Sequence, residues 1–136
     1  MKNILILCTG NSCRSIMAEA LINQLGKGHY IAESAGSNPT GYIHPKTIDT
    51  LIRHKIEIGE PRSKSWHEFV DRNIDLIITV CDQAANENCP IFSGNYKKLH
   101  WSIPDPANCT GTKEDINLAF DGALQKLKQH IEDELI

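Results

Sequence analysis

Two short runs of consecutive apolar residues stand out along the chain, NILILC at residues 3–8 and DLIITVC at residues 75–81. Runs of this length, rich in Ile, Leu and Val, predict strands that are buried on both faces. Two weaker patterns, YIAESAG at residues 30–36 and KLHW at residues 98–101, predict two more strands. The chain is therefore expected to contain four strands.

Segments with the periodicity of helices lie between and after these strands. Residues 14–26 and 44–55 predict one helix each, residues 65–72 a short helix, and Thr112 the N-cap of a long final helix. The expected apolar faces of the first two helices comprise Ile16, Met17, Ala20, Leu21 and Leu25, and then Ile48, Leu51 and Ile52. The expected face of the long helix comprises Ile116, Ala119, Phe120, Ala123, Leu124, Leu127, Ile131 and Leu135.

Strands that alternate with helices in this way predict a single α/β domain over residues 1–136, with an open, mostly parallel four-stranded sheet flanked by helices. Ligands of such sheets bind beyond the carboxyl ends of the strands. Cys8 and Cys81 each end one of the two apolar runs, so the sequence places both cysteines at this edge of the sheet.

Composition and charge exclude several classes of function. The 136 residues are 40% hydrophobic and 23% charged, with a formal net charge of -3. Without a basic run that would neutralise several phosphates, no nucleic-acid partner is expected. The apolar run near the start is too short for a signal peptide or a membrane span, so we expect a cytoplasmic protein with no membrane partner. Its five cysteines are then expected to be reduced thiols rather than structural disulfides.

The segment CTGNSCRS, residues 8–15, joins the first strand to the first helix. Its small and turn-forming residues allow backbone N–H groups to face inward at a helix N-terminus and to bind a tetrahedral oxyanion. Arg14 is expected to hold two anion oxygens with its planar guanidinium, and Ser15 to hydrogen-bond the Cys8 sulfur. These groups are expected to lower the pKa of Cys8 and favour a thiolate nucleophile. The predicted oxyanion site comprises Thr9, Gly10, Asn11, Ser12, Cys13, Arg14 and Ser15.

This segment resembles the signature loop of low-molecular-weight protein tyrosine phosphatases and of the arsenate reductases that share their fold. The resemblance extends over essentially the whole chain. Both groups use a cysteine thiolate that attacks a tetrahedral oxyanion, an arginine that binds the anion and a distant aspartate as general acid. The resemblance implies that these residues are Cys8, Arg14 and Asp105, the last of which lies in PDPAN.

Two features favour the reductases over the phosphatases. The phosphatases carry aromatic residues directly after their Asp-Pro, where this chain has Ala107 and Asn108. In addition, Cys81 and Cys89, in VCDQAANENCPIF, resemble the relay cysteines of thioredoxin-coupled arsenate reductases, including the proline after the second cysteine. The alternative is that Cys81 is a buried strand-end residue and Cys89 an incidental loop thiol.

The spacing of these two cysteines limits the conformations in which they can form a disulfide. If residues 81–89 formed one helix, their Cα atoms would lie about 12 Å apart, whereas a disulfide needs about 4.4–6.8 Å. The segment is therefore expected either to fold back as a loop or to unwind when the disulfide forms. A mobile redox segment follows as a prediction.

The resemblance implies reduction of arsenate to arsenite, with Cys8, Arg14, Asp105, Cys81 and Cys89 as catalytic residues and arsenic detoxification as the purpose. Phosphate and sulfate are expected to bind as analogues of arsenate, and phosphatase activity is expected to persist at a residual level. No metal and no organic cofactor is required. Thioredoxin or another thiol donor is the expected partner, and the protein is expected to act as a monomer.

Some reductases of this family bind potassium beside the anion loop, and Asn11, Glu19 and Ser34 match three of the ligand positions. At the position of a further acidic ligand this chain has Lys64. Its ammonium group is expected to replace the charge of the ion and to help orient Asn11, so that activity depends weakly or not at all on potassium. The alternative is that Lys64 is an exposed loop residue.

Two other functions stay open at this point. The first is a low-molecular-weight phosphatase that hydrolyses phosphoesters through a phosphocysteine, for which Cys81 and Cys89 would be dispensable. The second is a non-catalytic metalloid-binding or redox-sensing protein, for which Asp105 would be dispensable. Cys109 has no role that the resemblance supplies, and no close Cys-x-x-Cys pair indicates a zinc site.

Overall fold

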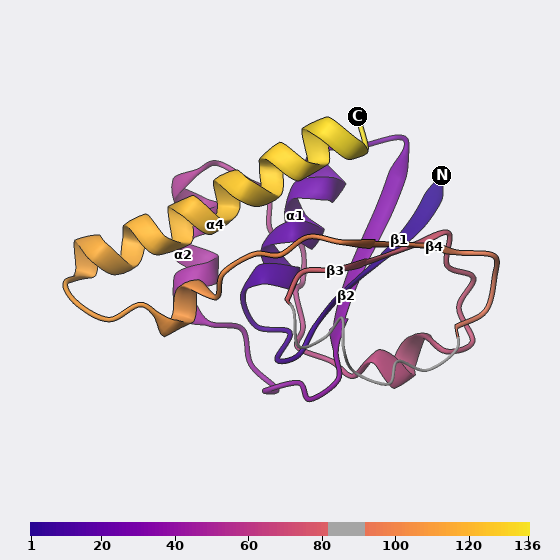
Figure 1. Cartoon of the computed structure of the whole chain (residues 1–136), viewed down its shortest axis with the longest axis horizontal. Coiled ribbons are helices and arrows are strands. Elements are labelled where there is room, and N and C mark those ends of the chain that lie inside the picture. The colour runs from indigo at the N-terminus through magenta and orange to yellow at the C-terminus, as the bar shows by residue number, and fades with distance from the viewer. Residues whose placement is uncertain (82–91) are drawn as a thin grey trace.

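A computed structural model describes residues 1–81 and 92–136. Its centre is a four-stranded sheet of order β2-β1-β3-β4 in which every strand pairing is parallel. The strands are β1 (Lys2–Cys8), β2 (Tyr30–Gly36), β3 (Leu76–Thr79) and β4 (Lys97–His100). The predicted four-stranded parallel α/β domain is therefore confirmed (Figure 1).

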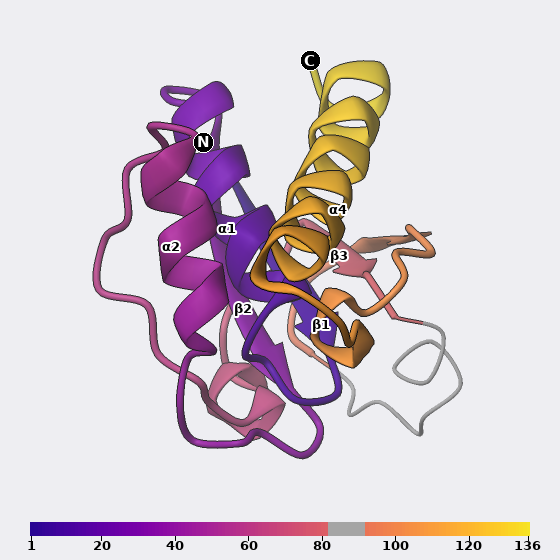
Figure 2. The same ribbon diagram turned by 90° about the vertical axis from the view of Figure 1, so that its left-hand side faces the viewer.

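Within residues 1–81 and 92–136, the remaining elements are three α-helices and two short 3₁₀-helices. They are α1 (Arg14–Leu25), α2 (Pro45–Arg53), η1 (Trp66–Phe69), η2 (Pro106–Asn108) and α4 (Lys113–Glu134). Figure 2 shows that α1, α2 and α4 lie together over one side of the sheet. Within the described residues, no helix combines the length and apolar character needed to cross a bilayer.

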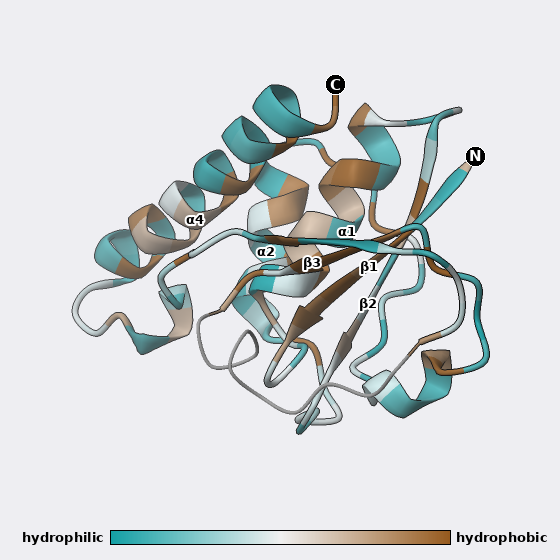
Figure 3. Cartoon of the chain, turned by 45° about the vertical axis from the view of Figure 1, so that its right-hand side comes forward, coloured by the Kyte–Doolittle hydropathy of each residue, from teal (hydrophilic) through white to brown (hydrophobic). Residues whose placement is uncertain are grey.

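The interior strand β1 is buried because its side chains alternate between two apolar clusters. Ile4 and Ile6 pack into the larger cluster with side chains of α1 and α4, and Leu5 and Leu7 pack against the segment that contains η1. Figure 3 shows β1 and β3 as hydrophobic ribbons between more polar elements. Covering both faces explains why the sequence of this strand is apolar without interruption.

The long helix α4 begins where the sequence predicts. The Thr112 side chain accepts a hydrogen bond from the Asp115 N–H at 3.1 Å, and the Asp115 carboxylate accepts one from the Thr112 N–H at 3.1 Å. This reciprocal capping box pairs backbone N–H groups that the first turn would otherwise leave unsatisfied, and it typically contributes about 1 kcal/mol.

Several local expectations were wrong. Leu25 and Ile52 are 37% and 64% exposed, whereas Thr47 and Thr50 of α2 are completely buried. Periodicity of apolar residues misses such threonines, because a hydroxyl is tolerated inside when it is hydrogen-bonded. The predicted strand 75–81 ends at Thr79, and only Trp66–Phe69 of the predicted helix 65–72 is helical, as a 3₁₀ turn.

The strand order determines where a ligand site forms. From β1 the chain passes to β2 on one side, and it later enters β3 on the other side of β1. In open parallel sheets the crevice at such a switch point, beyond the carboxyl ends of the strands, is the usual ligand site. Cys8 ends β1, and Cys81 lies two residues after the end of β3.

Candidate active site

In the loop between β1 and α1, backbone carbonyl groups point away from the concave side and accept hydrogen bonds from neighbouring segments. The Thr9 carbonyl accepts from the Asn38 N–H at 3.0 Å, and the Gly10 and Ser12 carbonyls accept from N–H groups of the same following segment, Thr40 and His44. Among the residues that the structure describes, none accepts a hydrogen bond from the N–H of Gly10, Asn11, Ser12 or Cys13. The loop is therefore arranged as an anion-binding nest at the N-terminus of α1.

Gly36 at the end of β2 permits this loop to approach the neighbouring strand. A Cβ atom at Gly36 would collide with the Thr9 carbonyl oxygen and would lie 2.9 Å from the Cys8 carbonyl oxygen. Real Cβ atoms do not approach backbone oxygens so closely, so only glycine fits here. Gly36 was not among the predicted site residues, although a glycine at the end of a predicted strand is a signal for close backbone approach.

Asn11 is the buried centre of the loop's support. Its φ of 49° is left-handed, a conformation that asparagine adopts more readily than most residues. Its amide donates to the Ser15 hydroxyl at 2.8 Å and to the Ser34 hydroxyl at 3.0 Å, and its oxygen accepts from the Lys64 N–H at 2.9 Å. One side chain thus joins the loop to α1, to β2 and to the segment before η1. The bond expected from Ser15 to the Cys8 sulfur stays a prediction.

A buried ion pair extends this support behind the loop. The Ser34 hydroxyl donates to Glu19 at 3.0 Å, and the Lys64 ammonium lies 3.9 Å from the same carboxylate oxygen and donates to the Arg62 carbonyl at 3.2 Å. Burial raises the pKa of Glu19 and lowers the pKa of Lys64, and each charge partly offsets the shift of the other. Lys64 is only 9% exposed, so it is not an exposed loop residue. A potassium ion does not fit this arrangement, because the ammonium group already faces the carboxylate.

Arg14 and Asp105 meet at the rim of the loop. One Arg14 nitrogen donates to the Ile103 carbonyl at 2.8 Å, and the other terminal nitrogen lies 3.6 Å from Asp105. The Arg14 Nε is buried and has no hydrogen-bond partner within the described part of the chain. The Asp105 carboxylate also accepts the Ala107 N–H at 3.0 Å, which caps η2 and holds the carboxylate at this position.

A cavity of about 570 Å³ lies between the anion loop and the segment that carries Asp105. Its described lining residues are Thr9, Gly10, Arg14, Cys81, Ser102, Ile103, Pro104, Asp105 and Asn108. No aromatic side chain is among them, as the residues after Asp105 indicated. The described part of the lining thus provides polar and cationic groups and no aromatic wall.

Cys81 lines this cavity, and its thiol interacts with that of Cys8 at the start of the anion loop; both thiols are buried. The Thr9 hydroxyl lies 3.6 Å from the Cys81 sulfur. The hydrogen bond with Cys81, followed by burial, raises the pKa of the Cys8 thiol, whereas the Arg14 charge and the Thr9 N–H lower it. The expectation of a lowered pKa is therefore wrong for this arrangement, because the hydrogen bond with Cys81 and burial both favour the neutral Cys8 thiol.

The remaining cysteines differ in their surroundings. Cys89 lies outside the described residues, as does nearly all of the predicted mobile redox segment. Cys13 is buried inside the anion loop. Cys109 is partly exposed near the start of α4, and its thiol donates weak bonds to the carbonyls of Thr110 and Asp115. In residues 1–81 and 92–136, no group of three His, Cys, Asp or Glu side chains is placed to hold a metal ion.

Comparison with known proteins agrees with this geometry. The family described as low molecular weight phosphotyrosine protein phosphatase matches residues 3–135. Arsenate reductase 2 of Staphylococcus saprophyticus is 36% identical over 128 residues, which cover 94% of this chain and 95% of that protein. A solved structure of an arsenate reductase in the reduced state is 25% identical, with a TM-score of 0.78 and coverage of 98% of this chain and 95% of its own. The thioredoxin-dependent arsenate reductase of Corynebacterium glutamicum is 25% identical with a TM-score of 0.66, and the match covers 97% of this chain and 62% of that one.

Replacing Asn11 by alanine is expected to weaken both folding and anion binding. The variant Asn11→Ala loses three hydrogen bonds at a buried site, which predicts a loss of about 2–4 kcal/mol in the free energy of unfolding. Urea denaturation measures this change, and calorimetric titration with inorganic phosphate measures binding. Asn38→Ala is the control, because Asn38 is exposed and reaches the loop through its backbone. Unchanged stability and phosphate affinity in Asn11→Ala would contradict the assigned role.

Replacing Cys81 by alanine is expected to lower the pKa of Cys8, because the largest influence that raises it is removed. The rate of alkylation of Cys8 by iodoacetamide, followed against pH by mass spectrometry of the Cys8 peptide, should then reach its midpoint at lower pH. Cys109→Ala should leave the midpoint where it is in the unmodified protein. A midpoint that stays the same or rises in Cys81→Ala would show that contact with Cys81 does not control Cys8.

Proposed function

The chain belongs to the low molecular weight phosphotyrosine protein phosphatase family, and we propose that it reduces arsenate to arsenite through a cysteine adduct and a disulfide relay. The observation that carries this proposal is the contact between the Cys8 and Cys81 thiols beneath the anion loop. Hydrolysis of a phosphoester needs one thiolate, an arginine and an acid, and it has no use for a second thiol against the first. Reduction through a disulfide relay requires this second thiol.

The first step forms the adduct. Arsenate binds to the N–H groups of the loop and to Arg14, and the Cys8 thiolate attacks arsenic. Asp105 donates a proton to the departing oxygen, which leaves as water, and a covalent thiol–arsenate adduct remains. Arg14 supports this step because its charge favours the Cys8 thiolate, and its guanidinium lies 3.6 Å from the side chain of Asp105, which must be protonated to act as the acid.

The second step transfers the electrons. The Cys81 thiolate attacks the Cys8 sulfur, the sulfur–arsenic bond breaks and its electron pair stays on arsenic, which leaves as arsenite. The two thiols are oxidised to a Cys8–Cys81 disulfide. Cys8 ends β1 and Cys81 follows the neighbouring parallel strand β3 by two residues, so the interaction of their thiols makes this attack short-ranged. The Thr9 hydroxyl beside Cys81 is placed to stabilise the attacking sulfur.

The third step regenerates Cys8. Cys89 attacks Cys81, which releases the Cys8 thiolate and moves the disulfide to the Cys81–Cys89 pair, where an external dithiol reduces it. One relative of known structure is thioredoxin-dependent, which supports thioredoxin as this donor. The steps require no metal and no organic cofactor. Phosphate has the same shape and charge as arsenate, so some phosphatase activity is expected from the same loop.

The test couples arsenate reduction to NADPH oxidation through thioredoxin and thioredoxin reductase. In Cys81→Ser and Cys89→Ser, arsenate turnover should fall at least about 100-fold, because removing a nucleophile abolishes its step. Hydrolysis of p-nitrophenyl phosphate by the same variants should persist, since it needs only Cys8, Arg14 and Asp105. The second assay also shows that the variants fold.

Two results would change the conclusion. Brisk ester hydrolysis without arsenate turnover by the unmodified protein would make it a phosphatase. Turnover only with glutathione and glutaredoxin would keep the chemistry and replace the donor.

Loss of arsenate turnover in Asp105→Asn, at unchanged phosphate affinity, is also expected, and it separates an enzyme from a non-catalytic metalloid sensor.

The Lys64–Glu19 pair predicts little response to potassium. Exchanging sodium chloride for potassium chloride at constant ionic strength should change kcat/KM for arsenate less than about twofold, because a fixed ammonium already faces the carboxylate. In Lys64→Gln the ammonium is absent, so a stimulation by potassium is expected to appear. Lys55→Gln is a control on an exposed lysine. A strong stimulation of the unmodified protein would contradict the role given to Lys64.

A further inference from the structure

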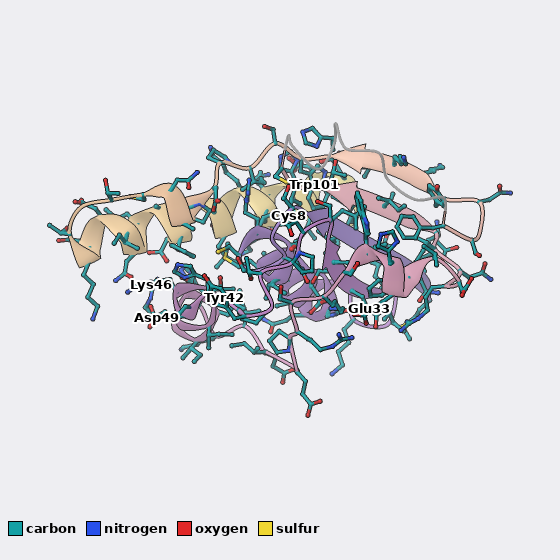
Figure 4. The ribbon with its side chains drawn as sticks, turned by 90° about the horizontal axis from the view of Figure 1, so that it is seen from below. Cys8, Glu33, Tyr42, Lys46, Asp49 and Trp101 are labelled. Carbon is teal, nitrogen blue, oxygen red and sulfur yellow. The ribbon has the colours of Figure 1, made fainter. Side chains whose placement is uncertain are left out.

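Thr47 is a buried hydroxyl of α2 that contacts two successive residues of the anion loop. Its side chain is completely buried. Its hydroxyl donates to the Ser12 carbonyl at 3.0 Å, and it also interacts with the Cys13 thiol. Figure 4 labels Lys46 and Asp49, two residues of α2 that lie before and after Thr47 in the sequence.

The Ser12 carbonyl is held twice. Besides the Thr47 hydroxyl, it accepts the His44 N–H at 3.1 Å. The Gly10 carbonyl is held in the same way, by the Thr40 N–H at 3.0 Å and the Ser63 hydroxyl at 3.2 Å. Two donors on one carbonyl fix the direction of the C=O bond more firmly than one donor does.

The direction of a carbonyl determines the direction of the next N–H group. A trans peptide unit is planar, and its C=O and N–H bonds point in opposite directions. Thr47 pulls the Ser12 carbonyl outward, so the Cys13 N–H of the same peptide unit points inward. The following residue is Arg14, whose guanidinium lies at the rim of the site. The hydroxyl of α2 thus acts on the part of the loop where it enters α1.

We propose that Thr47 is a positioning residue for the oxyanion, holding the Ser12–Cys13 peptide unit so that its N–H group faces the bound anion. The inference rests on the proposed function only in naming arsenate as the anion that turns over. Thr47 does not touch the anion, and it acts through the loop. Removal of its hydroxyl therefore weakens anion binding and leaves the relay steps intact.

The variant Thr47→Val tests this proposal, because valine keeps the shape of threonine and lacks the donor. The Kd of inorganic phosphate and the KM of arsenate are expected to rise about 5–10-fold, as loss of one well-placed hydrogen bond predicts, while kcat changes less than about twofold. Thr47→Ser keeps the hydroxyl and should restore both values to within about twofold of the unmodified protein.

Thr50→Val is the matched control. Thr50 is also completely buried on α2, and its hydroxyl donates to the Lys46 carbonyl within the helix at 2.6 Å. This variant should lose stability without weakening the binding of phosphate. An equal rise of the phosphate Kd in both valine variants would overturn the proposal, and so would unchanged binding in Thr47→Val.

A measurement on the unmodified chain keeps the proposal testable if Thr47→Val does not fold. Addition of inorganic phosphate should shift the amide resonance of Cys13 in ¹⁵N-labelled protein, because this N–H is expected to contact the anion. An unshifted Cys13 amide at saturating phosphate would overturn the proposal. Phosphate binding is independent of arsenate turnover, so failure here is distinguishable from failure of the proposed reaction.

Discussion

The outward direction of the carbonyl groups in the Thr9–Cys13 loop is the constraint on which the site depends. Each carbonyl held by the surrounding segments turns the N–H of its peptide unit toward the concave side. The donors come from the segment after β2, from α2 and from Ser63, so the loop is shaped by three separate parts of the chain. Such fixed N–H groups stabilise an anion without reorganising when it binds.

Asn11 and the Glu19–Lys64 ion pair support the same loop from its other side. A buried polar side chain is tolerated only when its groups are paired, and Asn11 uses its amide and its carbonyl oxygen in three bonds. Glu19 then accepts a hydrogen bond from Ser34, and the Lys64 ammonium faces the same carboxylate. Removing either member of this pair would leave the other charge uncompensated in a largely buried site.

The two thiols at the floor of the site combine a benefit with a cost. In the proposed relay, their contact shortens the distance over which the Cys81 sulfur attacks the Cys8 sulfur. The same contact raises the pKa of Cys8 and so opposes formation of the thiolate. Arg14 offsets this effect in part, because its charge lowers the same pKa. Its guanidinium lies beside Asp105 at the rim of the site, where the proposed reaction would also use it to bind the anion.

The local features of this protein follow from its amino-acid sequence. The apolar runs predicted two buried strands, the helical periodicity predicted α1 and α4, and CTGNSCRS pointed to an anion-binding loop with Cys8 and Arg14. These features could be predicted because strand burial, helix faces and loop chemistry depend on residues close together in the chain. Asp105 is distant from this loop in the chain, and only the family resemblance pointed to it. The position of Cys81 at the same edge of the sheet also followed, from the rule that parallel strands end together.

Which distant groups support the loop, and how the two thiols affect each other, depends on the folded chain. Thr47 lies 35 residues from Ser12, and Ser63 lies 53 residues from Gly10. Gly36 is required because the backbone carbonyls of Cys8 and Thr9 lie close to it, and the pKa of Cys8 rises because its thiol interacts with Cys81. Such effects depend on distances between residues that the folded sheet brings together. The spacing of those residues along the chain does not predict these distances.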